Sequence, residues 1–279
     1  MDSLKHWSLL DIPWDHFDPS KVDVDIVALV KTAAVVEENS KDYAAYLKNV
    51  FPADPEFHQA IDQWAVEEEQ HGQALSKWAE MADPTFQYAK AFKAFREGYK
   101  VPIDVNQSVR GSKTGELLAR CVVESGTSSY YTALKEATTE PVLKEICCHI
   151  AADEFRHYKL FYAFGKKYQS EEKRSLWDRL KTVYGRVAEV DDDELSYAYY
   201  ATNGKNQPYD LKHFQKVYFA KAYRMYKRVH LERAASMILK ATGLEPKGLL
   251  FKTGISVFWY LLNSRVRRAE RYLTRASNS

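Results

Sequence analysis

Two Glu-x-x-His motifs place metal-ligand side chains at matching positions of two segments that have the pattern of core-facing helices. The first motif is Glu68 with His71, and the second is Glu154 with His157. Residues three apart share one face of a helix, so each pair can present a carboxylate and an imidazole to one point. The other positions of these faces are apolar, which predicts that the four ligands are buried in a helical core. These positions hold Phe57, Ile61, Trp64, Leu75 and Trp78 in one segment and Leu143, Cys147, Ile150, Phe161 and Phe164 in the other.

Two further glutamates, Glu37 and Glu124, lie on the apolar faces of two other helical segments. Ala-Val-Val-Glu37 with a tyrosine six residues later matches Cys-Val-Val-Glu124 with a tyrosine six residues later, at an offset of 87 residues. The Glu-x-x-His motifs repeat at an offset of 86. The sequence therefore predicts a duplicated pair of helices, each pair carrying one glutamate and one Glu-x-x-His motif.

The four predicted core carboxylates need a counter-charge. An unpaired carboxylate in an apolar interior costs several kcal/mol, and no Lys or Arg occupies the corresponding core positions. Two divalent cations would supply the charge, since one Glu from each of two helices and a Glu-x-x-His from each of two others form the ligand set of dimetal carboxylate proteins. Mixed carboxylate and imidazole ligation favours a pair of iron ions, with Mn/Fe and Mn/Mn as alternatives.

Four long helices must carry these ligands, and we predict them at 22–50, 55–83, 112–138 and 141–165. Asp54 before Pro55, and Thr139-Glu140 before Pro141, are signals of a helix start. Short loops join the first helix to the second and the third to the fourth, whereas the connection 83–112 is long and contains a short helical stretch at 86–98. This connectivity predicts an all-α, ferritin-like four-helix bundle over residues 1–166 with a long crossover between helices two and three.

With these motifs, Glu-Glu68-Glu-Gln-His71 and Asp-Glu154-Phe-Arg-His157 preceded by Glu37 and Glu124, the chain resembles the ferritin-like diiron-carboxylate superfamily. That superfamily includes bacterioferritin, rubrerythrin, soluble acyl-carrier desaturases and the ribonucleotide reductase small subunit. The resemblance implies that Glu68 and Glu154 bridge the irons, that Glu37 and Glu124 are terminal ligands, and that each histidine binds one iron. It also implies that Glu67 and Asp153 orient the histidines.

Hydroxyl groups near the predicted ligands are candidates for a role in catalysis. Thr127 and Ser128 lie one turn after Glu124, where some oxygen-activating relatives keep a hydroxyl group near the metals. Leu75 occupies the place expected for the radical tyrosine of ribonucleotide reductase, which argues against radical storage of that kind. We expect the tyrosines within two turns of the ligand glutamates to serve mainly in packing.

Residues 167–279 form a basic, aromatic extension that we predict to be helical at 171–188, 210–242 and 254–275. Residues 209–279 contain 15 Lys and Arg but 4 Asp and Glu, although the whole chain has a net charge of only +2. The apolar stretch 254–262 is too short to span a bilayer. It could lie on an anionic membrane surface, bind an acidic carrier or electron donor, or pack against the bundle or across a homodimer interface. No recognised motif supports nucleic-acid binding.

Together these features favour a dinuclear non-haem iron oxidoreductase that uses dioxygen or peroxide to oxidise an organic substrate, for which lipid-like and carrier-bound molecules are the candidates. The alternative is an iron-handling protein that acts as a ferroxidase, in storage or in detoxification. The absence of a Cys-x-x-Cys pair implies a separate electron donor. Three cysteines with no disulfide spacing, and an N-terminus without a signal-peptide pattern, lead us to expect a cytoplasmic protein, in part membrane-peripheral.

Overall fold

The computed structural model describes residues 6–189, 193–204 and 207–276. All regular secondary structure in these ranges is helical, which confirms the all-α prediction. Three short 3-10 helices, Leu9–Asp11, Trp14–His16 and Pro19–Lys21, precede the first α-helix. The α-helices are α1 (Val24–Glu37), α2 (Ser40–Val50), α3 (Pro55–Ala82), α4 (Tyr88–Gly98), α5 (Lys113–Ala137), α6 (Pro141–Glu172), α7 (Leu176–Ala188), α8 (Asp193–Asn203), α9 (Leu211–Arg224), α10 (Arg228–Thr242) and α11 (Gly248–Ala276).

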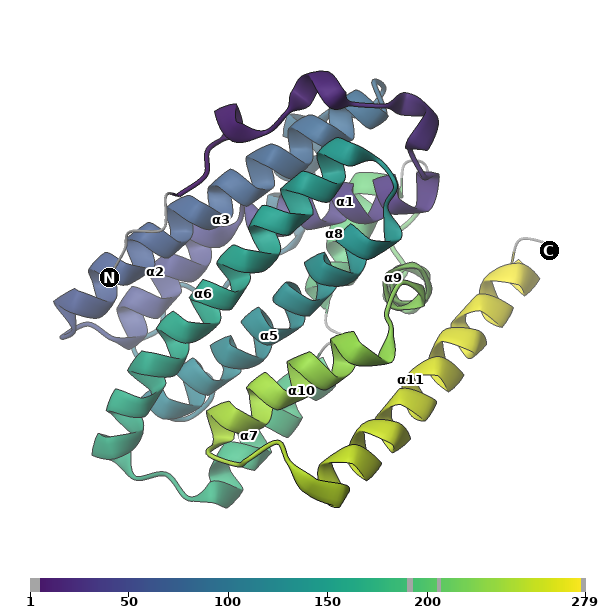
Figure 1. Ribbon diagram of the computed structural model, residues 1–279. Coiled ribbons are helices and arrows are strands. Elements are labelled where there is room, and N and C mark those ends of the chain that lie inside the picture. Colours follow the sequence, from purple (N-terminus) through teal and green to yellow (C-terminus); the bar gives the residue numbers. More distant parts are fainter. Residues whose placement is uncertain (1–5, 190–192, 205–206, 277–279) are drawn as a thin grey trace.

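The helices that carry the predicted ligands pack side by side. Helices α5 and α6 contact each other along their length, and α3 packs against α1, α2 and α6 (Figure 1). The chain reverses in short turns between α2 and α3 and between α5 and α6, whereas the longer connection from α3 to α5 contains α4. The observed order of short, long and short connections is therefore the predicted one.

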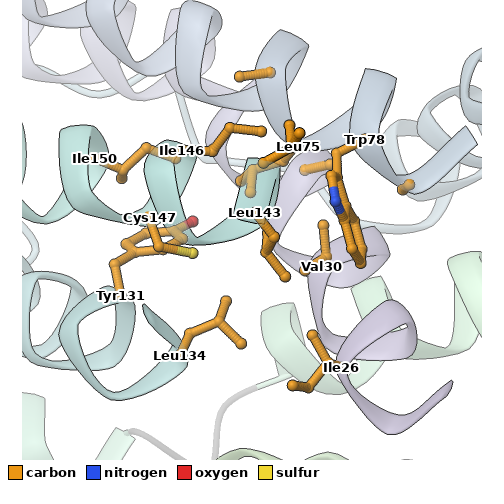
Figure 2. Packing of buried hydrophobic residues seen from close by; sticks show 14 of the residues in the cluster. Ile26, Val30, Leu75, Trp78, Tyr131, Leu134, Leu143, Ile146, Cys147 and Ile150 are labelled. Atoms are coloured by element: carbon orange, nitrogen blue, oxygen red, sulfur yellow. The ribbon is translucent and has the colours of Figure 1, made fainter. Parts of the chain in front are cut away.

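Two apolar clusters enclose the polar segment of these helices from either end. One cluster includes Leu75 of α3 and Leu143 of α6, and Figure 2 shows its packing. The other includes Ile61 of α3 and Phe161 of α6. In α3 and in α6 the Glu-x-x-His motif lies in the sequence between residues of the two clusters. The packed clusters therefore hold the two motifs at the same level of the helix pair.

Side-chain caps fix where the long helices begin. Asp54 accepts a hydrogen bond from the Phe57 amide, and Ser112 accepts one from the Gly115 amide. Glu140 is fully buried and caps α6 by accepting from two backbone amides of its first turn. It also accepts a hydrogen bond from Trp78 Nε1 at 2.7 Å, so the cap ties α6 to the end of α3.

The first predicted helix, 22–50, is wrong in one respect, because the structure divides it into α1 and α2 at Glu38 and Asn39. At this point α3 approaches closely: a Cβ atom at Gly72 would lie 2.8 Å from Glu38 Cβ. The absence of a side chain at Gly72 allows this approach. The break places Glu37 in the last position of α1, next to the predicted metal site.

Other predicted boundaries also need correction. The fourth helix continues past Gly165 to Glu172, because a lone glycine does not end a helix whose residues before and after it are packed in the core. The predicted helix at 210–242 is two helices, α9 and α10, which are separated at residues 225–227. Asp210 caps α9 by accepting a hydrogen bond from the His213 amide. Cys121 and Cys147 are buried, whereas Cys148 is exposed, and all three thiols are free.

The C-terminal helices pack against the ligand-bearing helices, except for the last one. Helices α7 and α10 contact α5, α8 contacts α1 and α4, and α9 contacts α1. Helix α11 packs against α9 and α10 at the side of the molecule (Figure 1). Its exposed large apolar side chains are Leu249, Leu250, Val257, Phe258, Tyr260 and Leu261. Within the described ranges, no helix combines the length and apolar character needed to cross a membrane.

Candidate metal centre

The structure brings all six predicted ligands together in the interior. They form two groups of four, in which one potential ligand atom from each residue lies within 4.8 Å of the others. The first group is Glu37, Glu68, His71 and Glu154, and the second is Glu68, Glu124, Glu154 and His157. All six residues are buried. Since Glu68 and Glu154 belong to both groups, the arrangement offers two adjacent sites with two shared carboxylates.

The imidazole Nδ1 atoms face the shared carboxylates. His71 Nδ1 lies 3.3 Å from Glu154 Oε1 and 3.5 Å from Glu68 Oε2. His157 Nδ1 lies 3.0 Å from Glu68 Oε1. The two unshared glutamates are farther from the rings: Glu37 Oε2 is 3.9 Å from His71 Nδ1, and Glu124 Oε2 is 3.9 Å from His157 Nδ1.

The donor atoms of this cluster fit a cation. His71 Nδ1, His157 Nδ1 and Glu154 Oε1 are buried, and each has no hydrogen-bond partner among the described residues. Buried polar atoms are normally paired, so three unpaired atoms within one cluster of candidate ligands require an explanation. A bound metal ion provides one, because neutral imidazole nitrogens and carboxylate oxygens are its usual ligands.

Glu67 and Asp153 hold the histidines in a crossed arrangement. His157 Nε2 donates to Glu67 Oε2 at 2.9 Å, and His71 Nε2 donates to Asp153 Oδ2 at 3.0 Å. Each histidine is therefore held by the acid that precedes the shared glutamate of the other helix. This contact keeps the proton on Nε2 and leaves Nδ1 available for a metal.

Two residues that sequence reasoning missed complete this support. Trp7 Nε1 donates to Asp153 Oδ2 at 2.7 Å, and the Trp7 ring stacks on His71 with the ring centroids 6.1 Å apart. Arg156 contacts Asp153 Oδ1 at 2.5 Å and Glu67 Oε2 at 3.4 Å, so it bridges the two acids. Arg156 lies beside the core face of α6, and its place directly before His157 was the one available signal. Trp7 is too distant in sequence to give any signal.

Without a metal, protons neutralise the cluster. Burial and the charges of Glu154 and Glu37 raise the pKa of Glu68 to about 8. Burial alone would lower the pKa of His157, but its hydrogen bond to Glu67 and the nearby charge of Glu68 raise that pKa to about 10. Two divalent cations carry the four positive charges that would balance the four glutamates, and their binding would release these protons.

The two candidate hydroxyl groups differ in their surroundings. Thr127 Oγ1 donates to Glu154 Oε2 at 2.5 Å, so it touches one of the shared carboxylates. Ser128 Oγ donates to the Ala151 carbonyl at 3.1 Å, which is a contact between α5 and α6 and not with the ligands. The Tyr131 hydroxyl donates to Glu37 Oε1, a role beyond the packing that we predicted for this tyrosine.

Two cavities adjoin the cluster. A cavity of about 80 Å³ is lined by Glu37, Glu68, Glu124, Glu154 and Thr127, among others. A larger cavity of about 190 Å³ lies between α1 and α5 on one side and the C-terminal helices on the other. Glu37 and Thr127 line both cavities, so a molecule in the larger one would lie beside the ligand cluster.

The chain matches no known protein-family profile, and comparison with curated proteins finds no match. The helical fold and its buried Glu/His cluster are compatible with a ferritin-like protein, and the buried groups lie close enough to hold a metal ion. Geometry alone therefore identifies this cluster as a candidate metal site.

Proposed function

We propose that the chain is a ferritin-like dimetal-carboxylate oxidoreductase. The order of its long helices, with short turns within each pair and a long connection containing α4 between the pairs, supports the ferritin-like assignment. The observation that carries the proposal is the sharing of Glu68 and Glu154 by two four-residue groups. Two separate mononuclear sites would have no need of shared ligands.

Iron suits this ligand set, with manganese as the alternative in one or both positions. Glu37 and His71 would complete one site, and Glu124 and His157 the other. When bound, a reduced iron pair supplies electrons to dioxygen or peroxide, so that a substrate can then be oxidised. The apolar clusters at either end of the site would exclude water from it.

The protein groups around the site have roles of their own. The Thr127 hydroxyl would fix the orientation of Glu154, and the Tyr131 hydroxyl would fix that of Glu37. Both donors lie on the side of the cluster that faces the larger cavity. This cavity favours oxidation of an organic substrate over iron storage, since storage has no use for an apolar chamber beside the metals. A separate electron donor would be needed to reduce the iron again.

Metal analysis tests the proposal. The purified chain, loaded anaerobically with Fe(II), should bind two ions, consume dioxygen on exposure to air, and do so repeatedly with an external reductant. Glu68→Gln should bind fewer than two ions. Glu69→Gln is the matched control, because Glu69 is the next residue of α3 and pairs with Lys41 outside the cluster.

Three results would contradict the proposal. A chain that binds no divalent metal would remove the centre altogether. Identical metal content in Glu68→Gln and Glu69→Gln would show that the metal binds elsewhere. Loading of many iron atoms per chain would favour the storage function instead.

A further inference from the structure

The larger cavity has a predominantly apolar wall that two parts of the chain build together. Val36 of α1 and Val122 and Val123 of α5 form one side, and Tyr218, Ala222 and Tyr223 of α9 form the other. Its volume of about 190 Å³ is somewhat larger than that of an apolar cavity that binds benzene. The C-terminal extension thus forms one wall of a pocket beside the ligand-bearing helices.

One polar group on this wall has no partner. Tyr130 lines the cavity, and its buried Oη forms no hydrogen bond with any described residue. Its neighbour Tyr131 uses the same group to bind Glu37. A buried hydroxyl without a partner is unfavourable, so a ligand oxygen in the cavity would satisfy Tyr130.

The charged groups on the wall already have counter-charges or hydrogen bonds. Glu194 accepts a hydrogen bond from the Tyr43 hydroxyl at 2.6 Å, and Arg186 lies 3.8 Å from Glu189. Glu37 belongs to the ligand cluster. The cavity therefore suits an uncharged molecule, because a charged one would lose its hydration without gaining a partner.

Gly126 lines the cavity at an exposed position of α5. It lies on α5 between Val123 and Tyr130, and a Cβ atom added there would meet no described atom within 4 Å. Glycine lowers helix stability by about 1 kcal/mol relative to alanine, so it has no advantage here for the helix itself. The absence of a side chain at Gly126 leaves more space in the cavity beside Thr127.

We infer that this cavity binds the organic substrate, and that the substrate is a compact, uncharged, mainly apolar molecule with one oxygen that hydrogen-bonds to Tyr130. Apolar cavities of about 150 Å³ bind benzene, so a cavity of this size holds a benzene-sized ring with a few additional atoms. That the bound molecule is a substrate rests on the proposed function, but binding to the cavity can be tested without metal.

Two probes of one shape test the assignment. Acetophenone and α-methylstyrene have the same number of heavy atoms and differ in a carbonyl oxygen that replaces a methylene group. Their affinities for the full-length chain, with and without Fe(II), can be measured by calorimetry or ligand-observed NMR. Tyr130→Phe should lower the ratio of acetophenone affinity to α-methylstyrene affinity by about threefold to tenfold, because it removes one hydrogen bond.

A cavity-filling variant gives the second test. Gly126→Leu should weaken both probes by more than about tenfold, since its side chain would occupy the space that they need. Gly254→Leu is the matched control, because Gly254 is an exposed glycine of α11, also with no described atom within 4 Å of an added Cβ. Gly126→Ala is a milder variant with the same expected direction, should the leucine prevent folding.

The outcomes separate this inference from the proposed function. No binding of either probe by a chain that holds two metal ions would overturn the cavity assignment, as would unchanged binding in a folded Gly126→Leu chain. An unchanged affinity ratio in Tyr130→Phe would overturn the role of Tyr130. Probe binding by a chain that takes up no metal when it is loaded with Fe(II) would support the cavity and contradict the metal centre.

Discussion

Asp153→Asn should weaken one half of the metal centre and leave the other half largely intact. Asp153 is buried and receives three donors: Trp7 Nε1 and His71 Nε2 on Oδ2, and Arg156 Nη1 on Oδ1. An asparagine retains one acceptor oxygen, but its amide nitrogen must face at least one of these donors. The His71 ring would then lose the contact that fixes its orientation.

Two magnitudes follow from this geometry. Leaving a buried donor unpaired costs about 1–3 kcal/mol, so the metal-free variant should be less stable by that amount. Loss of the acid that orients a ligating histidine lowers metal affinity by about tenfold to a hundredfold, which is about 1.4–2.7 kcal/mol. The affinity loss should fall mainly on the site completed by Glu37 and His71, since Glu67 still holds His157.

A Co(II) titration followed by visible absorption can resolve the two sites. We expect one strong and one weakened binding phase in Asp153→Asn, and two strong phases in the unaltered chain. Glu67→Gln should weaken the His157 site in the same way. Asp62→Asn is a suitable control, because Asp62 also lies on α3 but is exposed and pairs with Lys48.

This role of Asp153 is refuted if a folded Asp153→Asn chain, destabilised by no more than the expected value of about 1–3 kcal/mol, binds two ions as tightly as the unaltered chain. Equal weakening of both phases would also refute it, because the crossed contacts assign each acid to one histidine. A loss of stability without a change in affinity would reduce Asp153 to a packing role.

Three further predictions concern other parts of the molecule. Gly72→Ala should lower the free energy of unfolding in urea by about 1–3 kcal/mol, because the added Cβ would lie 2.9 Å from the Glu38 backbone nitrogen. Gly185→Ala on α7 is the control and should have no such effect, because an added Cβ there would meet no described atom within 4 Å. Asp83 has its pKa lowered to about 2, chiefly by its hydrogen bond with buried Lys31. The pair therefore stabilises the fold above about pH 4, and its contribution of about 1 kcal/mol is lost as the pH falls toward 2. The stability difference between the unaltered chain and Asp83→Asn should shrink over that range, and a constant difference would contradict this assignment. The exposed apolar face of α11 lies beside its arginines, so the chain should co-sediment with vesicles that contain anionic lipid and not with vesicles of phosphatidylcholine alone. Absence of sedimentation with either kind of vesicle would argue against a membrane surface as the partner.

The candidate ligands could be identified from the sequence because they follow local rules. Glu68 and His71 lie on a face whose other positions are apolar, and the same pattern repeats around Glu154 and His157. Helical periodicity fixes which residues share a face, and proline and capping residues mark where the helices start. These rules operate within one helix, so they were sufficient to predict that Glu68, His71, Glu154 and His157 face the interior.

Features that depend on contacts distant in sequence could not be predicted. Trp7 reaches Asp153 across 146 residues, and no periodicity connects them. The division between α1 and α2 depends on the close approach of Gly72, which lies on another helix. The cavity wall needs Tyr218 of α9 opposite Val123 of α5, and only the packing of the C-terminal helices decides that pairing.

The duplication of the ligands contrasts with the asymmetry of their surroundings. The offset of 87 residues that relates the two ligand glutamates also relates Thr127 to Ser40 and Tyr131 to Ala44. Thr127 donates to a shared glutamate, whereas Ser40 donates to a backbone carbonyl. Tyr131 donates to Glu37, whereas alanine at position 44 has no hydroxyl to offer. Among the six candidate ligands, Glu37 lines the larger cavity and accepts the Tyr131 hydrogen bond, whereas the glutamate that Thr127 contacts is shared by both sites. The larger cavity therefore lies at the Glu37 half of a nearly symmetric ligand set, and we expect oxidation of a substrate to occur on that side.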